Sequence, residues 1–242
     1  MKVGIIGYGE IGSSLAKVYN DFPQFEVLVV DPAVGFTDDL TGVEIINICI
    51  PFIDNFVSVV QDYIDQVKPR LTVIHSTVAP GTTKKITVGS NARVCHSPVR
   101  GVHPNLDTGI KTFLKYIGSE DYDAAVEYQA HLTAMNIESN ICKDSKTTEY
   151  AKLLSTSYYG VCIAFHNDVY KVCDDENLDF DEVMTLFNTT YNEGYTKLGK
   201  ENVTRPVLYP TNKIGGHCVV PNAKILKDYM NTKTVQSILE YE

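Results

Sequence analysis

Short apolar runs alternate with stretches of helical spacing along the first half of the chain. Residues 2–6 form an apolar run of strand length, and residues 13–19 have the spacing of a helix. A second apolar run covers residues 27–30 and ends on Asp31. Strand, helix and strand in this order predict a βαβ unit of a parallel sheet.

The same alternation continues to about residue 139. We predict strands at residues 43–50, 71–75, 93–95 and 116–118, an edge strand at 136–139, and helices over 55–67 and 121–135. These elements indicate an α/β fold with a Rossmann-type, mostly parallel sheet, to which we assign residues 1–143. The loops after its strands then meet at the carboxyl edge of the sheet, where open α/β sheets bind ligands.

From Ser145 onward the pattern is helical. Apolar residues recur at helical spacing, without proline and with Gly160 as the only glycine inside, so the pattern predicts one long helix over about residues 145–174. A helix of that length is typical of the spine of a second region. We therefore assign residues 144–242 to a smaller all-helical region for dimerisation and substrate binding.

Three further signals divide the helical region. Asp179 predicts the cap of a second helix, because acidic residues follow it in the first turn. Pro206 and Pro210 indicate a loop, and a last helical segment is predicted from Ala223 onward.

The turn after the first strand has the sequence Gly7-x-Gly9-x-x-Gly12. Gly7 allows a tight turn, Gly9 lets the backbone approach a pyrophosphate, and Gly12 lets the helix pack closely on the strand. Asp31 can accept hydrogen bonds from two ribose hydroxyls and would repel a 2′-phosphate, so we predict NAD rather than NADP. A glycine-rich structural turn is the alternative. The residues that we assign to cofactor binding are Gly7, Gly9, Glu10, Ile11, Gly12, Asp31, Pro51 and Thr77.

Composition narrows the partners and the compartment. The formal net charge of −9 argues against a nucleic-acid or anionic-membrane surface, and no apolar run approaches membrane-spanning length. The first strand starts at residue 2, so we expect no signal peptide. The six cysteines are scattered without a C-x-x-C pair, which favours reduced thiols in a cytoplasm. The histidines have no metal-ligand spacing, so we predict no metal.

Polar residues outside the glycine motif have two interpretations each. The loop over residues 76–83 either orients a water or substrate, or is a Pro-Gly turn followed by a threonine helix cap. Cys218 follows two glycines and a histidine, an environment in which a thiol can be reactive. The alternative interpretation is a small buried thiol. Lys152 lies in the middle of the predicted helix. Its side chain is solvated unless the helix face that it shares with Glu149 and Thr156 lines a cleft.

Six short motifs follow one another along the chain. They are Gly7-x-Gly9-x-x-Gly12, Ser76-Thr77-Val78-x-Pro80-Gly81-Thr82, Ser97-Pro98, Glu149-x-x-Lys152, Phe165-x-Asn167-Asp168 and Gly215-Gly216-His217-Cys218. As an ordered set they resemble the UDP-glucose/GDP-mannose dehydrogenase family, over nearly all of the chain. The last motif is most similar to the branch acting on UDP-N-acetylmannosamine and its relatives.

The resemblance implies oxidation of a sugar C6 alcohol to a carboxylate in two NAD-dependent hydride transfers. On that analogy Cys218 takes up the aldehyde as a thiohemiacetal and forms a thioester that water cleaves. Lys152 stabilises developing oxyanion charge, Thr77 positions a water near the cysteine, and Asn167 supports the site. The long helix, apolar on more than one face, then forms a homodimer, as the resemblance also implies.

Several positions depart from the family pattern. Thr156 stands for an asparagine, Asn222 for an aspartate, and Val99 for the glutamate that serves as general base in many members. His103 or His96 could replace that base, because an imidazole titrates near neutral pH. We also expect no room for the family's third, nucleotide-binding domain. A dimer partner then supplies those contacts, or the substrate is smaller, or the site no longer turns over.

Three functions remain open at this stage. The first is an NAD-dependent oxidoreductase resembling a minimal nucleotide-sugar dehydrogenase, with a small-molecule, nucleotide-sugar-like substrate. The second is a single-step hydroxyacid dehydrogenase that uses Lys152 as acid/base and leaves Cys218 idle. The third is a catalytically silent NAD-binding protein.

Overall fold

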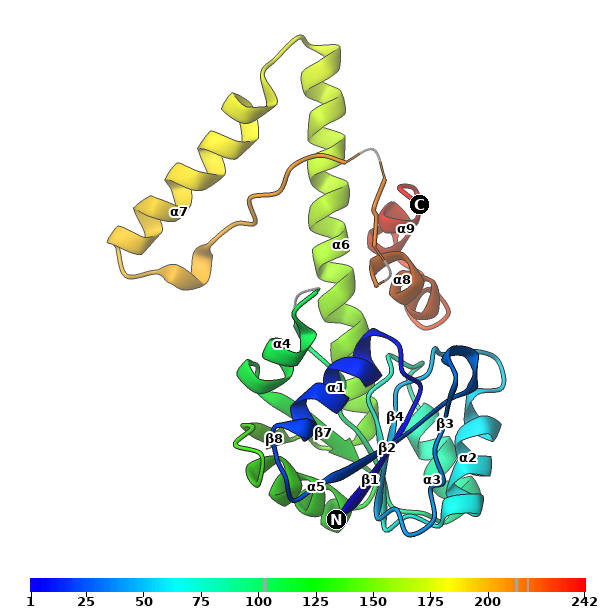
Figure 1. Ribbon diagram of the computed structural model, residues 1–242. Helices are drawn as coiled ribbons and strands as arrows, with labels where there is room; N and C mark the ends of the chain where they lie inside the picture. The colour runs from blue at the N-terminus through cyan, green and yellow to red at the C-terminus, as the bar shows by residue number, and fades with distance from the viewer. Residues whose placement is uncertain (102–103, 212, 217) are drawn as a thin grey trace. The chain divides into compact units, whose positions relative to one another are not determined.

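One eight-stranded sheet forms in the computed structural model, which describes residues 1–101, 104–211, 213–216 and 218–242. Its order is β3-β2-β1-β4-β5-β6-β7-β8. Helices such as α1, α2 and α5 flank the sheet (Figure 1). The pairs β2–β3 and β6–β7 are antiparallel, and the other pairs are parallel. The strands are β1 (Lys2–Ile6), β2 (Glu26–Asp31), β3 (Phe36–Thr37), β4 (Ile45–Ile48), β5 (Leu71–Ile74), β6 (Val94–His96), β7 (Lys115–Ser119) and β8 (Ser139–Ile141).

Helices cover both faces of this sheet and bury a separate apolar cluster on each. The first cluster is shared with α1 (Glu10–Asn20), α4 (Leu106–Thr112) and α5 (Tyr122–Thr133). The second is shared with α2 (Phe56–Val67) and α3 (Thr82–Ser90). Alternate residues of β1 divide between them, with Val3 and Ile5 in the first cluster and Ile6 in the second. Because both faces are covered, the strands are continuous apolar runs.

The predicted Rossmann-type, mostly parallel sheet is confirmed, with one shifted strand. The edge strand expected at residues 136–139 begins only at Ser139, because the preceding residues end α5 instead. Asn136 adopts φ +55°, and the Ile137 amide donates back to Leu132 O at 3.0 Å. This helix end satisfies the last backbone carbonyl groups of α5, and it uses residues that the pattern had assigned to the strand. The pattern also gives no signal for β3 or α4.

The chain divides into two compact units, Met1–Lys152 and Leu153–Glu242, and the division falls inside α6 (Ser145–Asp175). The long helix is confirmed, and the second unit is all-helical. Gly160 of α6 lies where α8 (Val219–Lys227) and α9 (Lys233–Leu239) pack, since a Cβ there would be 2.5 Å from Val219 and 3.2 Å from Ile238.

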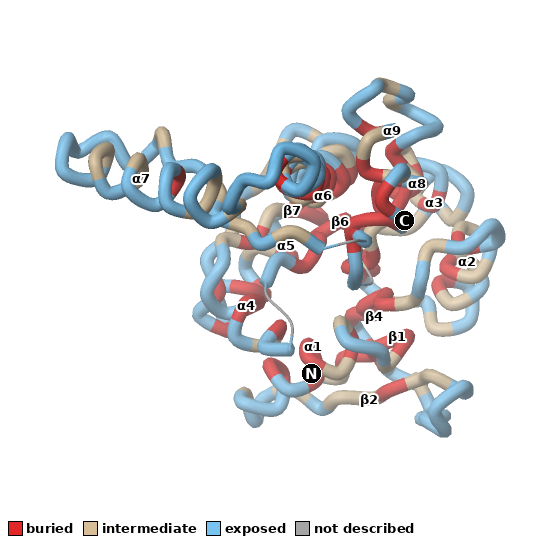
Figure 2. Tube along the Cα trace, turned by 90° about the horizontal axis from the view of Figure 1, so that it is seen from above, coloured by how far each residue is buried: buried red, intermediate tan, exposed pale blue. Residues whose placement is uncertain are grey.

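The remaining helix of the second unit is α7 (Phe187–Lys197), preceded by a π-helical turn (Asp181–Leu186). Asp179 accepts hydrogen bonds from the amides of Asp181 and Glu182, so its predicted capping role is confirmed. Most of α7 is exposed or half-buried (Figure 2). Short 3-10 turns lie at Pro32–Val34 and Glu201–Val203.

The last helical segment was expected from Ala223, but α8 starts four residues earlier, at Val219. Val219, Val220, Ala223 and Leu226 are buried, which makes the earlier residues part of the same apolar face. Pro221, which looks like a breaker, lies in the first turn, where its missing N–H is not needed. No helix in the described part of the chain is both long and apolar enough to cross a membrane.

The contact between Gly12 and Gly7 gives a test of the fold. A Cβ at Gly12 would be 1.9 Å from Gly7 O, whereas a Cβ at Gly9 would meet nothing within 4 Å. Helix propensity alone favours Gly12→Ala by about 1 kcal/mol. We expect instead a loss of about 2–4 kcal/mol in the free energy of unfolding, because backbone would have to move.

Urea denaturation followed by circular dichroism measures the difference. Gly9→Ala is the matched control and should change the free energy of unfolding by less than about 1 kcal/mol. A Gly12→Ala variant as stable as the unmodified protein would contradict the described packing.

Candidate functional site

The turn between β1 and α1 is built around three glycines. Gly7 adopts φ +92°, and a Cβ there would lie 2.9 Å from the Cys49 carbonyl group. Gly12 packs directly on Gly7, and the space above Gly9 is open. Gly7 and Gly12 are therefore required because a side chain there would collide with the backbone. Gly9 leaves the approach to the turn open. An extended anion could reach the first amides of α1 there.

Asp31 ends β2 beside this turn. Its Oδ2 accepts from the Tyr8 amide at 2.7 Å, and its Oδ1 accepts from the Ala33 amide at 3.2 Å. The Tyr8 ring lies 4.4 Å from the Phe36 ring of β3. The half-buried carboxylate is thus fixed at the glycine turn, and each oxygen keeps acceptor capacity for a ligand hydroxyl.

The ends of β4 and β5 are joined by Ser76. Its hydroxyl donates to Ile50 O at 2.6 Å and lies 3.3 Å from Ile48 O. Pro51 is exposed and Thr77 is half-buried, and each lies three residues after the end of its strand, β4 and β5 respectively. Since β1, β2, β4 and β5 are parallel neighbours, all the predicted cofactor residues lie at the same carboxyl edge of the sheet.

A buried carboxylate caps α3. Glu149 of α6 accepts from the Gly81 amide at 2.5 Å and from the Thr83 amide at 2.8 Å. The threonine cap considered for this loop is therefore wrong: Gly81 occupies the cap position with φ +90°, and the acceptor comes from 66 residues further on. Burial raises the pKa of Glu149, and the amide hydrogen bonds oppose that rise.

Lys152 lies one turn after Glu149 and is half-buried. Its ammonium donates to Val99 O at 2.9 Å, so the helix face that carries both residues contacts loops at the carboxyl edge rather than only solvent. Thr148, on the same turn as Glu149, is hydrogen-bonded to His96 Nδ1 at 2.7 Å.

His96 does not suit the role of general base. It is fully buried, and its other ring nitrogen lies 3.2 Å from Ser76 O. Burial lowers the pKa of His96 to about 3. Because both ring nitrogens are occupied inside the protein, the suggestion that His96 replaces the missing glutamate is wrong. His103, the other candidate, lies outside the described residues, as does His217.

Sequence patterns missed a buried polar network under the same loops. Lys115 of β7 is buried, and its ammonium donates to Ser97 O at 2.8 Å and Pro98 O at 3.3 Å. The sequence did contain a signal for this burial, because Lys115 and Ile117 share one face of the strand. The predicted strand, however, began one residue later, at Tyr116.

Cys218 directly precedes α8 and is half-buried. The loop before it is fixed at two points within the second unit. Asn167 of α6 accepts from the Thr211 amide at 2.7 Å, and the Ile214 amide donates to Tyr241 O at 2.7 Å. Asn167 is buried, and its Nδ2 has no hydrogen-bond partner among the described residues. It therefore positions the loop and keeps a free donor.

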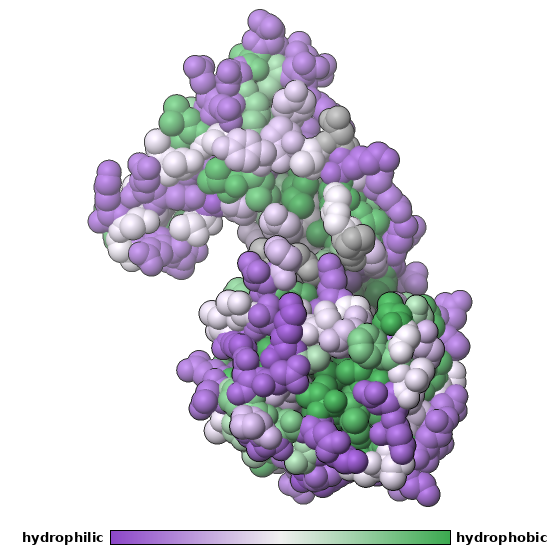
Figure 3. Space-filling view, in the orientation of Figure 1, coloured by the Kyte–Doolittle hydropathy of each residue, from purple (hydrophilic) through white to green (hydrophobic). Residues whose placement is uncertain are grey.

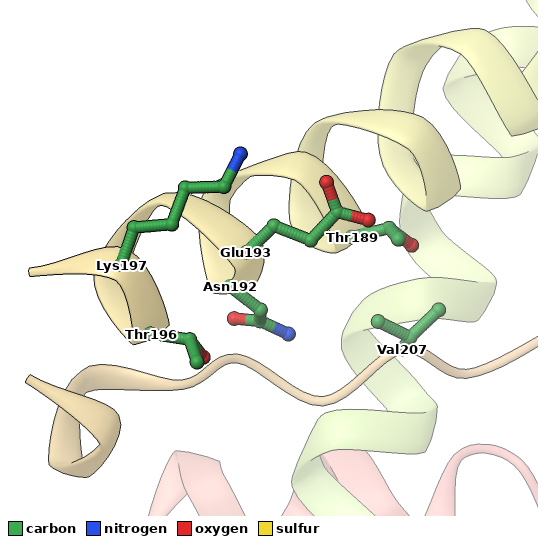
Figure 4. Close-up of a pocket in the computed structure, with 6 residues that line it drawn as sticks. All are labelled: Thr189, Asn192, Glu193, Thr196, Lys197 and Val207. Carbon is green, nitrogen blue, oxygen red and sulfur yellow. The ribbon is translucent and has the colours of Figure 1, made fainter. Parts of the chain in front are cut away.

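The second unit also carries a surface depression that is separate from these residues. A shallow depression lies between α7 and the extended segment at Val207, and Asn192 points toward that segment (Figure 4). None of the residues assigned to catalysis or cofactor binding lines it; its lining is Thr189, Asn192, Glu193, Thr196, Lys197 and Val207. Across the described ranges, no group of three His, Cys, Asp or Glu side chains could hold a metal ion.

Comparison with protein families confirms the resemblance for the second part of the chain. Residues 146–240 match the model described as the UDP-glucose/GDP-mannose dehydrogenase family, central domain. The UDP-N-acetyl-D-mannosamine dehydrogenase of Methanococcus vannielii is 26% identical over 235 residues, 89% of this chain and 47% of that protein. The UDP-N-acetyl-D-mannosamine dehydrogenase of Methanocaldococcus jannaschii is 27% identical over 188 residues, which are 73% of this chain and 41% of that protein. The chain thus spans about half the length of these relatives.

Solved structures share the fold. The UDP-D-ManNAc dehydrogenase of Pyrococcus horikoshii superposes with a TM-score of 0.79 at 17% identity, covering 100% of this chain and 68% of that one. A 3-hydroxyisobutyrate dehydrogenase of Mycobacterium tuberculosis gives 0.70 at 12% identity, with 99% and 91% covered. At these identities the likeness shows the fold alone.

The Glu149 cap predicts a defined loss of stability. Glu149→Ala leaves the Gly81 and Thr83 amides without their acceptor, so we expect the free energy of unfolding at pH 7 to fall by about 1–3 kcal/mol. The folded-state pKa of Glu149 is raised, so its contribution is largest below the unfolded-state pKa and decreases as the pH rises through the folded-state value. The gap between the proteins should therefore be wider at pH 4 than at pH 8.

Urea denaturation at the two pH values measures that gap. Glu138→Ala removes an exposed glutamate of the same unit and is the control, with an expected change below about 0.5 kcal/mol. Equal losses in both variants would show that the two amide bonds contribute nothing to stability.

Proposed function

We propose that this chain acts as an NAD-dependent oxidoreductase on a nucleotide sugar. Its residues 146–240 match the central domain of the UDP-glucose/GDP-mannose dehydrogenase family. The supporting observation is that the glycine turn, Asp31 and the loop that Lys152 contacts all lie at the carboxyl edge of a Rossmann-type sheet. Its substrate is then a UDP-linked hexose or N-acetylhexosamine, and its compartment the cytoplasm.

The cofactor fits the residues present. The open approach above Gly9 leaves room for a pyrophosphate at the first amides of α1, and the Asp31 carboxylate is held ready to accept from ribose hydroxyls. Pro51 and Thr77 would line the remainder of the site. Bound NAD would supply the hydride acceptor for each oxidation.

The chain's own groups divide the remaining work. The Cys218 thiolate adds to the carbon of the aldehyde, forming a C–S bond, and after the second oxidation water cleaves the thioester to release the carboxylate. Lys152, whose ammonium donates to Val99 O, stabilises the oxyanion. Thr77 positions the water, and Asn167 holds the loop that carries the cysteine.

The departures at Val99, Thr156 and Asn222 bear on the second step. With His96 sealed in the core, no described histidine replaces the family's glutamate at this loop. The single-step dehydrogenase that uses Lys152 and the silent NAD-binding protein are therefore the two rival functions, and the number of NADH formed per substrate separates all three.

The first prediction concerns the cofactor. NAD should bind at least about tenfold more tightly than NADP, because the Asp31 carboxylate repels a 2′-phosphate. Asp31→Ala should narrow that ratio, as should Asp31→Asn, which keeps an acceptor for the Tyr8 amide. Calorimetric titration measures the affinities, and equal binding of NAD and NADP to the unmodified protein would refute the assignment.

The second prediction tests the reaction itself. With UDP-N-acetylmannosamine as test substrate, two NADH should form per sugar oxidised. Cys218→Ser should stop at the aldehyde after one NADH, with the NAD affinity unchanged, because the thiol serves only the second oxidation. Absorbance at the NADH band and trapping of the aldehyde by a hydrazine measure both. Cys49→Ser is the control, because that thiol is buried in the apolar cluster shared with α1, α4 and α5.

The third prediction concerns assembly. Leu154, Tyr158, Phe165 and Val172 are each more than 40% exposed and fall on one side of α6, with half-buried Val161 between them. Hydrophobic surface is visible on the helical unit (Figure 3). We expect a homodimer built on this stripe, and light scattering should return twice the chain mass.

A double substitution of Tyr158→Asp and Phe165→Asp should shift that mass to the monomer. Tyr122→Asp, at an equally exposed tyrosine of α5, should leave the dimer intact. A monomer mass for the unmodified protein at high concentration would contradict the dimer.

A further inference from the structure

Lys115 is an unusual residue for the interior of a sheet. It is 3% exposed, and its recorded partners among the described residues are two carbonyl oxygens and, at 3.4 Å, the imidazole of His75. Burial lowers the pKa of its amine to about 7. Placing an ammonium in this environment is costly. The two carbonyl oxygens that this side chain holds belong to Ser97 and Pro98.

The next carbonyl along the chain is held by the other lysine. Lys152 donates to Val99 O at 2.9 Å, so three consecutive carbonyl oxygens each receive an N–H from a lysine. The two ammonium groups therefore bind one short segment, and the charge of Lys152 contributes to lowering the pKa of Lys115. Lys152 thus depends on a loop whose shape Lys115 sets.

The same segment is anchored to the centre of the sheet. His75 Nδ1 lies 2.9 Å from Ser97 O, and its Nε2 lies 3.0 Å from Asn47 Oδ1. The Asn47 amide in turn donates to Gly4 O on β1 at 3.2 Å. His75 and Asn47 are fully buried. The Ser97 carbonyl is therefore contacted by two buried side chains, Lys115 of β7 and His75 at the end of β5.

We propose that Lys115 is a positioning residue for Lys152: by fixing the Ser97 and Pro98 carbonyls it presents the Val99 carbonyl that orients the Lys152 ammonium. The inference rests on the proposed function, because it assigns a catalytic task to Lys152. The contact with Val99 O sets the direction of the ammonium, and a correctly directed cation stabilises a developing oxyanion. A long, flexible lysine gains from such an anchor, because less rotamer freedom is lost in the transition state.

Substitution of Lys115 tests the coupling. Lys115→Met removes a costly buried charge and keeps side-chain volume, so the variant should fold, with NAD affinity within about twofold. Its kcat with UDP-N-acetylmannosamine should fall about tenfold with KM nearly unchanged, and Lys115→Arg should restore part of the loss. Lys111→Met, which removes an exposed lysine paired with Asp21, is the control and should retain full kcat.

The double variant separates positioning from general damage. If Lys115 acts through Lys152, the Lys115→Met/Lys152→Met protein should be no slower than Lys152→Met alone. Losses that multiply would overturn the proposal. Should Lys115→Met not fold, Lys115→Gln gives the same comparison, because its shorter neutral side chain cannot hold both carbonyls.

A second measurement needs no turnover. Competitive acetylation with acetic anhydride, read by mass spectrometry against exposed Lys84, reports how firmly Lys152 is held. Lys115→Met should raise the relative rate at Lys152 at least threefold. An unchanged rate in the folded variant would overturn the positioning role. A raised rate in a protein that forms no NADH would support that role while refuting the proposed function.

Discussion

The carboxyl edge of the first unit depends on one buried carboxylate. Glu149 receives two backbone amides at the start of α3 and thereby closes the loop that carries Thr77. An ionised carboxylate is tolerated without solvent only when donors surround it, and a helix N-terminus supplies them. The consequence reaches beyond α3, because the same turns of α6 present Thr148 to His96 and Lys152 to Val99. The first turns of α6 thus hold two segments, the loop before α3 and the end of β6 with the loop that follows it.

The elements that sequence reasoning could predict are those whose signal is local. Apolar runs identified β1, β2, β4 and β5 because strands covered on both faces need nothing else. The long helix followed from unbroken spacing, and its single glycine marks the place where α8 and α9 pack. The glycine motif was informative for a geometric reason, since a side chain at Gly12 would collide with Gly7.

What the sequence could not provide are partners that lie far apart in the chain. Glu149 caps a helix 66 residues before it, and His96 is sealed by a hydroxyl 52 residues after it. Local periodicity contains no information about such pairs, so the threonine cap and the histidine base were reasonable and wrong. The last helix extends back across Pro221, because a proline is tolerated in the first turn of a helix. The pairing of Cys218 with Lys152 stays a prediction.

The two anchors of the Cys218 loop have a consequence for how the protein folds. Thr211 is tied to Asn167 across 44 residues, and Ile214 is tied to Tyr241 across 27. Each closure requires a long stretch of chain to lose its freedom before a single hydrogen bond forms. The loop should therefore become ordered only after α6 and α9 have packed, as one of the last events of folding. The Cys218 thiol would therefore reach its folded position late, after the helices that anchor its loop have packed.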